Sequence, residues 1–240
     1  VLPGPSESTT STPDARPLRV TVVGDSMAHA LAINQPKGLA TNLTISDGSI
    51  DGCDVFDSGR GVSSEGFKID FARCAGWQDR WAAATRNNHA EVALVVIGAW
   101  DVLDVVQSDG SRLAVGTPAH DEAYLAQLQK GIDAVAATGA KVAFLQVACM
   151  RPVNAKGAAT PPLPERADDN RANHLSALFR QAVARNPATT AYITGPAEWC
   201  NGSKIASDTG YRWDGVHVYK PGANLIYTTV LGQLQQLHLS

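Results

Sequence analysis

Five short apolar segments alternate with five amphipathic segments along most of this 240-residue chain. The apolar segments are rich in β-branched residues, which is typical of strands covered on both faces. We predict these strands at residues 18–24, 43–50, 92–98, 141–147 and 190–194. The amphipathic segments carry apolar residues at spacings of three and four, as in helices that bury one face. We predict these helices at residues 26–33, 77–88, 120–138, 166–185 and 221–237.

This alternation constrains the fold class. Strand–helix–strand units with right-handed crossovers build a parallel sheet that carries helices on both faces. We therefore predict an α/β fold, a three-layer α/β/α sandwich around a five-stranded parallel sheet of the flavodoxin-like type. Ligands of such folds bind at the carboxyl ends of the strands, where Ser26, Gly98 and Asp101 fall. Residues 51–76 and 148–165 are predicted to be long irregular segments, which in compact domains are more often functional than idle.

The composition defines the ends of the domain and excludes some partners. Residues 1–17 are rich in Pro, Ser and Thr and are predicted to be a linker, followed by a single domain at residues 18–240. The chain begins with Val, so we expect a signal sequence or another domain upstream. A net charge of -3 gives no cationic field that would attract nucleic acid or an anionic membrane. As an isolated domain the chain is expected to be a monomer.

The cysteine pattern leaves two states open. Cys53, Cys74, Cys149 and Cys200 form no Cys-x-x-Cys pair, which argues against zinc-ribbon and thioredoxin sites. They form either two disulfides or four free thiols. Of the three possible pairings we favour Cys53 with Cys74 and Cys149 with Cys200, because each would tie a loop beside a predicted strand end. No histidine spacing predicts a metal, and no nucleotide-binding motif predicts a cofactor.

Three residues far apart in the sequence suggest a reaction. Ser26 follows the first predicted strand, while Asp214 and His217 lie three residues apart near the other end of the chain. A hydroxyl is a poor nucleophile at neutral pH unless an imidazole takes its proton, and a carboxylate fixes the tautomer of that imidazole. We predict Ser26 as nucleophile, His217 as base and Asp214 as the group that orients it. No serine lies in the Gly-x-Ser-x-Gly setting of the α/β-hydrolases.

These motifs resemble those of the SGNH (GDSL-type) hydrolase superfamily. Gly24-Asp25-Ser26 is similar to its first block and Asp214-Gly215-Val216-His217 to its last. The second block resembles residues 47–52, which implies that the N–H of Gly52 joins that of Ser26 in an oxyanion hole. The third block, Gly-x-Asn-Asp in the family, is Gly98-Ala99-Trp100-Asp101 here. Either the indole N–H of Trp100 replaces the missing asparagine, or the hole consists of the Ser26 and Gly52 N–H groups alone.

Several residues near these blocks are candidates for substrate contact. His29 lies one helical turn after Ser26 and is either an acceptor-site residue or a helix-surface histidine. Asp25, Trp100 and Asp101 are further candidates, with a packed tryptophan and solvated carboxylates as the alternative.

A smaller group within the superfamily is also similar. The Gly-x-Trp-Asp block, the Gly-Cys at residues 52–53, the Cys74-x-x-Trp77 motif and the Pro/Ser/Thr-rich leader resemble extracytoplasmic SGNH domains fused behind bacterial membrane acyltransferases of the third acyltransferase family. The resemblance implies an extracytoplasmic O-acyltransferase, specifically an O-acetyltransferase, tethered to a membrane domain. That domain would deliver the acyl donor, and Ser26 would pass the acyl group to a carbohydrate or glycolipid hydroxyl of the cell envelope.

Two other functions remain open at this stage. A secreted carbohydrate esterase would use the same acyl-serine and differ only in that water accepts the acyl group. A glycan-binding module that has lost turnover would hold the Ser26 hydroxyl beyond hydrogen-bond reach of His217. The pattern of residues cannot separate transfer from hydrolysis, because the acceptor is chosen by pocket shape and water exclusion.

Overall fold

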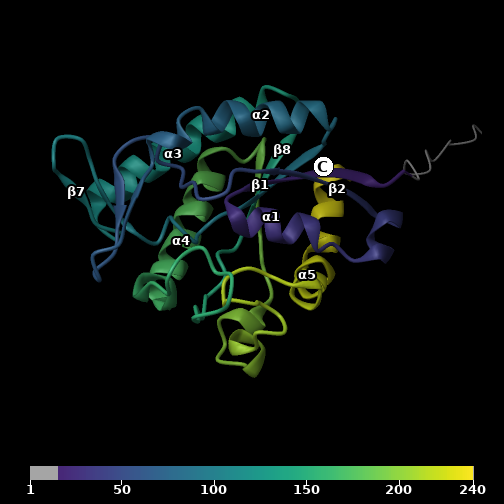
Figure 1. Ribbon diagram of the computed structural model, residues 1–240. Coiled ribbons are helices and arrows are strands. Elements are labelled where there is room, and N and C mark those ends of the chain that lie inside the picture. Colours follow the sequence, from purple (N-terminus) through teal and green to yellow (C-terminus); the bar gives the residue numbers. More distant parts are fainter. Residues whose placement is uncertain (1–15, 240) are drawn as a thin grey trace, which may run out of the picture.

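The computed structural model describes residues 16–239, so the predicted linker at residues 1–17 lies outside them except for its last two residues. The five predicted strands form one sheet in the order β2-β1-β5-β8-β9, with every neighbouring pair parallel (Figure 1). The strands are β1 (Leu18–Gly24), β2 (Leu43–Ser49), β5 (Val92–Val96), β8 (Lys141–Leu145) and β9 (Thr190–Ile193). The predicted α/β class is therefore confirmed.

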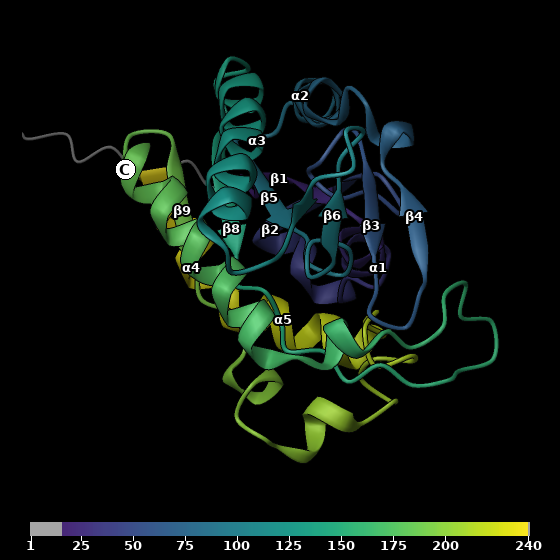
Figure 2. The same ribbon diagram turned by 90° about the vertical axis from the view of Figure 1, so that its left-hand side faces the viewer.

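Helices cover both faces of this sheet. On one face α2 packs against α3 and α3 against α4, and on the other face α1 and α5 lie together (Figures 1 and 2). The bounds are α1 (Ser26–Ile33), α2 (Trp77–Asn87), α3 (Pro118–Ala136), α4 (Asp169–Arg185) and α5 (Lys220–Leu239). All five residues of β5 are buried, as expected for a central strand between two helical layers.

Two helices begin two or more residues away from their predicted starts, and α5 begins one residue earlier than predicted. α3 starts at Pro118 instead of residue 120, because the Thr117 hydroxyl caps it and proline is harmless at a first helical position. α4 starts at Asp169 instead of residue 166, because the Asp168 carboxylate accepts from the Asn170 N–H at 2.9 Å and so caps the helix there. Helical periodicity alone does not show which polar residue forms the cap.

A second sheet corrects the prediction that residues 51–76 are irregular. Four short antiparallel strands run in the order β4-β3-β6-β7, and two of them come from that segment. They are β3 (Arg60–Val62), β4 (Lys68–Asp70), β6 (Asp104–Val106) and β7 (Arg112–Leu113). Strands of two or three residues are too short for a side-chain period to be visible in the sequence.

Short 3-10 helices lie between these strands and α-helices in the described part of the chain. They are η1 (Lys37–Thr41), η2 (Ala72–Cys74), η3 (Pro164–Ala167), η4 (Ala197–Trp199) and η5 (Lys204–Ser207). Within residues 16–239, no helix combines the length and the apolar character needed to span a bilayer.

Both favoured disulfides are present. Cys53 pairs with Cys74 and Cys149 with Cys200, with Cα–Cα distances of 5.5 Å and 5.0 Å, and none of the four cysteines is free. The first bridge joins the loop after β2 to η2, and the second joins the loop after β8 to η4. Each bridge therefore fixes a loop at the carboxyl edge of the sheet.

The strand order puts a topological switch point between β1 and β5. From β1 the chain moves to β2 on one side and then, through α2, to β5 on the other. The two strand ends approach so closely that a Cβ on Gly24 would lie 2.0 Å from the Val96 carbonyl oxygen. This crevice is the usual binding place in open α/β sheets, and Ser26 and Trp100 follow the two strands that form it.

Candidate active site

Ser26 is the first residue of α1 and is held there by the residue before it. The Asp25 carboxylate accepts from the Met27 N–H at 2.6 Å and from the Ala99 N–H at 3.2 Å. Asp25 thus caps α1 and joins the ends of β1 and β5. Among the described residues the Ser26 N–H has no acceptor, and it points out of the positive end of a helix dipole.

A hydrogen-bonded chain joins Ser26 to His217 and Asp214, as predicted from their spacing. His217 Nδ1 lies 2.7 Å from Asp214 Oδ2, and His217 Nε2 lies 2.7 Å from Ser26 Oγ. An ionised carboxylate can only accept, so Nδ1 carries the proton and Nε2 is free to accept from the Ser26 hydroxyl. This is the arrangement that a serine nucleophile and its base require.

The turn between Asp214 and His217 holds the carboxylate ionised. Asp214 Oδ1 accepts from the Val216 N–H at 3.0 Å and the His217 N–H at 2.8 Å. Burial alone would raise the pKa of Asp214, but the hydrogen bonds and charge of His217 together with these N–H groups lower it. Gly215 has a φ of +78°, and a Cβ there would lie within 1.6 Å of the Arg151 carbonyl oxygen. Only glycine fits that position.

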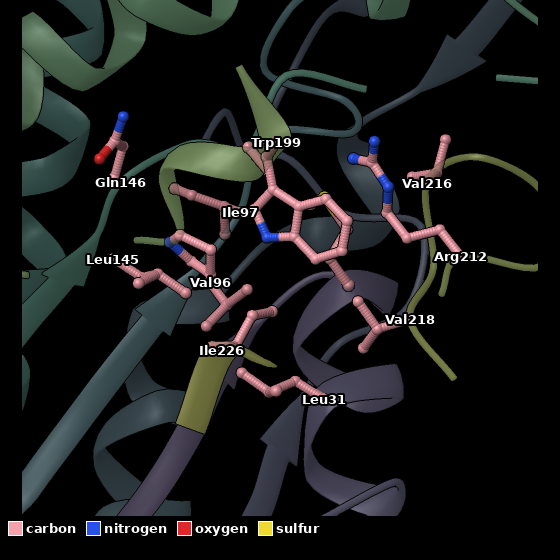
Figure 3. Close-up of a pocket in the computed structure, with 13 residues that line it drawn as sticks. Leu31, Val96, Ile97, Leu145, Gln146, Trp199, Arg212, Val216, Val218 and Ile226 are labelled. Atoms are coloured by element: carbon pink, nitrogen blue, oxygen red, sulfur yellow. The ribbon is translucent and has the colours of Figure 1, made fainter. Parts of the chain in front are cut away.

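A buried arginine supports this turn from behind. Arg212 donates to the carbonyl oxygens of Cys149 at 2.7 Å and Ala206 at 2.5 Å. Its guanidinium lies 4.4 Å from the ring centre of Trp199. Figure 3 shows Arg212 beside this indole, at an enclosed cavity of about 30 Å³ that Val216 and Val218 also line. Burial lowers the pKa of Arg212 to about 10, so it remains charged at neutral pH.

The opposite wall of the site contains Gly52 and a residue that the motifs did not indicate. Gly52 has a φ of +74°, and both terminal nitrogens of Arg73 lie 3.3 Å from the place a Cβ would take. Arg73 Nη2 donates to the Asp51 carbonyl oxygen at 3.0 Å. Cys53 and Cys74, the residues that follow Gly52 and Arg73, form the first disulfide. A predicted oxyanion donor and a cation are therefore held side by side.

Trp100 does not present its N–H to the site. The residue is 6% exposed, its ring stacks on Phe67 at 6.1 Å, and the Arg166 guanidinium covers it at 4.5 Å. Its Nε1 atom is buried and has no acceptor among the described residues. The proposal that the indole N–H replaces the missing asparagine is therefore not supported, and the packed tryptophan is the better description.

These groups line one broad pocket of about 730 Å³. The pocket is lined by Ser26, His217, Gly52 and Arg73. His29 also lines it, and its Nδ1 lies 2.6 Å from an oxygen of Asp47. Ile33 and Tyr219 at its rim are 61% and 48% exposed. The remaining wall is largely apolar and includes Ala30, Phe67, Ile69, Trp100, Trp213 and Val218. The pocket could hold a substrate larger than a single acetyl ester.

Two predicted substrate contacts are corrected. Asp25 and Asp101 are 0% and 1% exposed and do not line the pocket. Asp101 accepts from the Tyr124 hydroxyl at 2.8 Å and lies beside the buried carboxyl of Asp54. Burial raises the pKa of Asp25 to about 7 and of Asp101 to about 6. These carboxyl groups position the strand ends and do not meet a ligand, because the residue after a buried strand often turns inward to cap a helix or bond a neighbour.

The motifs also missed several pocket residues. Arg166 is buried, donates to the Ala99 carbonyl oxygen at 2.8 Å and lines the pocket. Ile69 comes from β4 of the second sheet, Phe67 from the residue just before that strand, and Arg73 from η2. One signal for Arg73 was available: if Cys74 pairs with Cys53, the residue before Cys74 must lie near Gly52. The others carried no signal in the sequence.

Away from this pocket, the described residues contain one cluster of three side chains that could ligate a metal. It consists of His120, Asp121 and His174, whose ligand atoms lie within 4.8 Å of one another. One oxygen of Asp121 lies 3.2 Å from His120 Nδ1 and 2.7 Å from His174 Nε2. Hydrogen bonds between the carboxylate and the two imidazoles account for this geometry.

Comparison with known proteins places the chain in a family and a fold. Residues 19–233 match the family model described as "Protein of unknown function (DUF459)". No curated protein matches the sequence. A solved structure assigned as an acylhydrolase from Bacteroides fragilis is similar, with a TM-score of 0.59, 13% identity, and coverage of 95% of this chain and 91% of that one.

Two more solved structures have a similar fold. A GDSL-like lipase from Bacteroides thetaiotaomicron has a TM-score of 0.55 at 14% identity, covering 91% of this chain and 88% of its own. An acetyl xylan esterase has a TM-score of 0.54 at 14% identity, covering 91% and 98%. The fold is therefore that of the SGNH hydrolases, whose similar members are acylhydrolases and esterases.

Proposed function

The chain belongs to the DUF459 family, and for this member we propose a serine-dependent, ester-acting enzyme whose substrate is an acylated carbohydrate or an acyl donor for one. The observation that carries the proposal is the continuous hydrogen-bonded chain from Ser26 Oγ through His217 to Asp214 at the wall of an open pocket. The fold shared with acylhydrolases and esterases supports it.

The reaction follows from the order of these groups. Ser26 Oγ attacks the carbonyl carbon of the ester, and its proton passes to His217 Nε2 while the carbonyl π electrons move to the oxygen. Asp214 stabilises the imidazolium that forms, without taking its proton. The N–H groups of Ser26 and Gly52 face the oxyanion. The intermediate then collapses, His217 returns the proton to the leaving alcohol, and an acyl-serine remains.

The acceptor of that acyl group gives the finer proposal. We propose an O-acyltransferase, of the O-acetyl type, in which His217 deprotonates a carbohydrate or glycolipid hydroxyl of the cell envelope and this oxygen attacks the acyl-serine. The apolar and aromatic wall of the pocket supports this, because sugar rings pack well on such side chains. The acyl donor would come from a membrane acyltransferase domain of the same protein.

A carbohydrate esterase is the second candidate, and the acetyl xylan esterase among the similar structures favours it. It uses the same acyl-serine and lets water accept the acyl group. The glycan-binding module requires Ser26 beyond hydrogen-bond reach of His217, and the 2.7 Å contact does not meet that condition.

An extracytoplasmic location fits the covalent structure. Disulfides form and persist in oxidising compartments, and here both pairs of cysteines are bridged. We propose that the domain acts on the outer side of a bacterial membrane.

The first test compares the protein with Ser26→Ala on a short-chain nitrophenyl ester, with and without an oligosaccharide acceptor. We expect nitrophenol release that the substitution abolishes, and an acylated serine trapped by mass spectrometry. Acylated sugar among the products identifies the transferase, and free acid alone identifies the esterase. Equal turnover by the two proteins would refute the proposed function.

A further inference from the structure

The oxyanion hole of the proposed enzyme has one hydrogen-bond donor fewer than that of related hydrolases. At the position where related hydrolases carry an asparagine, Trp100 is packed between Phe67 and Arg166, and its N–H is buried without an acceptor. Two backbone N–H groups remain, from Ser26 and Gly52. Loss of one oxyanion donor costs a serine hydrolase on the order of a hundredfold in rate, so a replacement would have a large effect.

Arg73 is a cation beside Gly52, one of the two remaining donors. Its two terminal nitrogens are 3.3 Å from the Cβ position of Gly52, and it lines the same pocket as Ser26 and His217. One of its N–H groups is used by the Asp51 carbonyl oxygen. Among the described residues no carboxylate lies within ion-pair distance of it. The guanidinium therefore has further donors and an uncompensated charge next to the proposed oxyanion.

The chain holds this arginine in place covalently. The Cys53–Cys74 disulfide joins the residues that directly follow Gly52 and Arg73, and both cysteines are buried. An exposed arginine in a free loop would sample many positions, whereas the backbone of Arg73 is fixed relative to Gly52. Side-chain reach then keeps the guanidinium near the Gly52 N–H.

We propose that Arg73 is a catalytic residue, resting on the proposed function: its guanidinium donates to the oxyanion and replaces the missing asparagine. As Ser26 Oγ bonds to the carbonyl carbon, the negative charge that develops on the carbonyl oxygen faces the Gly52 N–H and the Arg73 cation. When the carbonyl π bond re-forms, the C–O bond to the leaving group breaks and the negative charge passes to the leaving oxygen, which takes the proton of His217. Arg73 neither gains nor loses a proton. A guanidinium suits this role because it stays protonated at all working pH values.

The test uses Arg73→Ala and Arg73→Lys on a neutral nitrophenyl ester, for which no anionic substrate group can explain an effect. We expect kcat to fall on the order of a hundredfold for Arg73→Ala with little change in KM, and less for Arg73→Lys. Arg80→Ala, an exposed arginine on α2, is the matched control and should behave as the unmodified protein. Millimolar guanidinium chloride should restore part of the activity of Arg73→Ala, while the same concentration of sodium chloride should not.

The outcomes separate this inference from the proposed function. Unchanged kcat in Arg73→Ala, together with loss of activity in Ser26→Ala, overturns the role of Arg73 alone. A rise in KM with unchanged kcat on this ester makes Arg73 a substrate-binding residue and also overturns its role at the oxyanion. Activity that survives in Ser26→Ala overturns the proposed function itself.

Discussion

The two walls of the pocket are built in different ways: one contains a disulfide, and the other is hydrogen-bonded to a loop that a second disulfide fixes. The His217 wall, residues 211–219, is a tight turn in which Asp214 accepts from the N–H groups of Val216 and His217. Arg212 connects this turn to the carbonyl oxygens of Cys149 and Ala206 behind it. Its carboxylate, Asp214, has a lowered pKa. The Gly52 wall, residues 50–74, combines a glycine turn, two short strands and an exposed arginine. The carboxyl groups beneath it, Asp54 and Asp101, have raised pKa values because they are buried together.

This difference determines which parts of the site can be predicted from the sequence and which parts cannot. The His217 wall brings its acid and base together within one turn, so its parts are close in the sequence as well as in space. The Gly52 wall brings Gly52 and Arg73 together through a bridge between two separate segments, and Ser26 and Trp100 reach the same side of the pocket from two further segments. We expect substitutions on the first wall to affect the proton relay, and those on the second to affect the oxyanion and stability.

The largest effect is expected on the His217 wall. Asp214→Asn should lower kcat for ester cleavage by about 10⁴-fold, because an amide can no longer hold the His217 tautomer that accepts from Ser26. Stability should change little, since the Asn oxygen can still accept from the Val216 and His217 N–H groups. The measurements are kcat and the thermal midpoint. Asp133→Asn, exposed on α3, is the control, and a loss of less than tenfold would contradict the role of Asp214.

The same contrast explains how far the sequence could predict the molecule. Strand β1 and helix α1 have the predicted bounds, because a buried β-branched run followed by an Asp cap is a local signal. Ser26 could be found from its place directly after a strand, and Asp214 and His217 from their residue types and their spacing of three. The burial of Asp25 and Asp101 could not, since a carboxylate after a strand can face solvent or turn inward, and only the neighbouring strand end decides. The position of Arg73 near Gly52 could be predicted only from the Cys53–Cys74 pairing.

Removing each disulfide separately should affect stability and kcat to different extents for the two walls. In the loop-entropy account, the sequence separations of 21 and 51 residues correspond to about 3 kcal/mol for Cys53–Cys74 and about 4 kcal/mol for Cys149–Cys200. The double variant Cys149→Ala/Cys200→Ala should therefore lose more stability. The variant Cys53→Ala/Cys74→Ala should lose more kcat, because Gly52 and Arg73 lose their common anchor, whereas Arg212 still supports the His217 wall.

Denaturant unfolding measures the loss of stability in each double variant. The loss of kcat is measured at a temperature where both variants are folded. Circular dichroism confirms that the fraction folded is the same. If the Cys149–Cys200 variant lost kcat as strongly as the other, the disulfides would act through overall stability, and the division into two walls would fail.

The smallest effect concerns the buried acids of the Gly52 wall. Burial raises the pKa of Asp54 well above 3.8, and the charge of the neighbouring Asp101 raises it further, so the folded protein keeps a proton that the unfolded chain releases. The free energy of unfolding contributed by this group falls as pH rises from the unfolded pKa to the folded one, by up to about 1.4 kcal/mol per pH unit.

In Asp54→Asn the amide can donate to Asp101 and accept from the Phe56 N–H without a titrating proton. Relative to the unmodified protein, this variant should become progressively more stable from pH 5 to pH 8 in urea unfolding. Asp57→Asn, a partly exposed neighbour that contacts Lys130, is the control and should follow the unmodified protein. A constant difference across this range would mean that Asp54 is ionised in the folded state and that the Gly52 wall carries no buried proton.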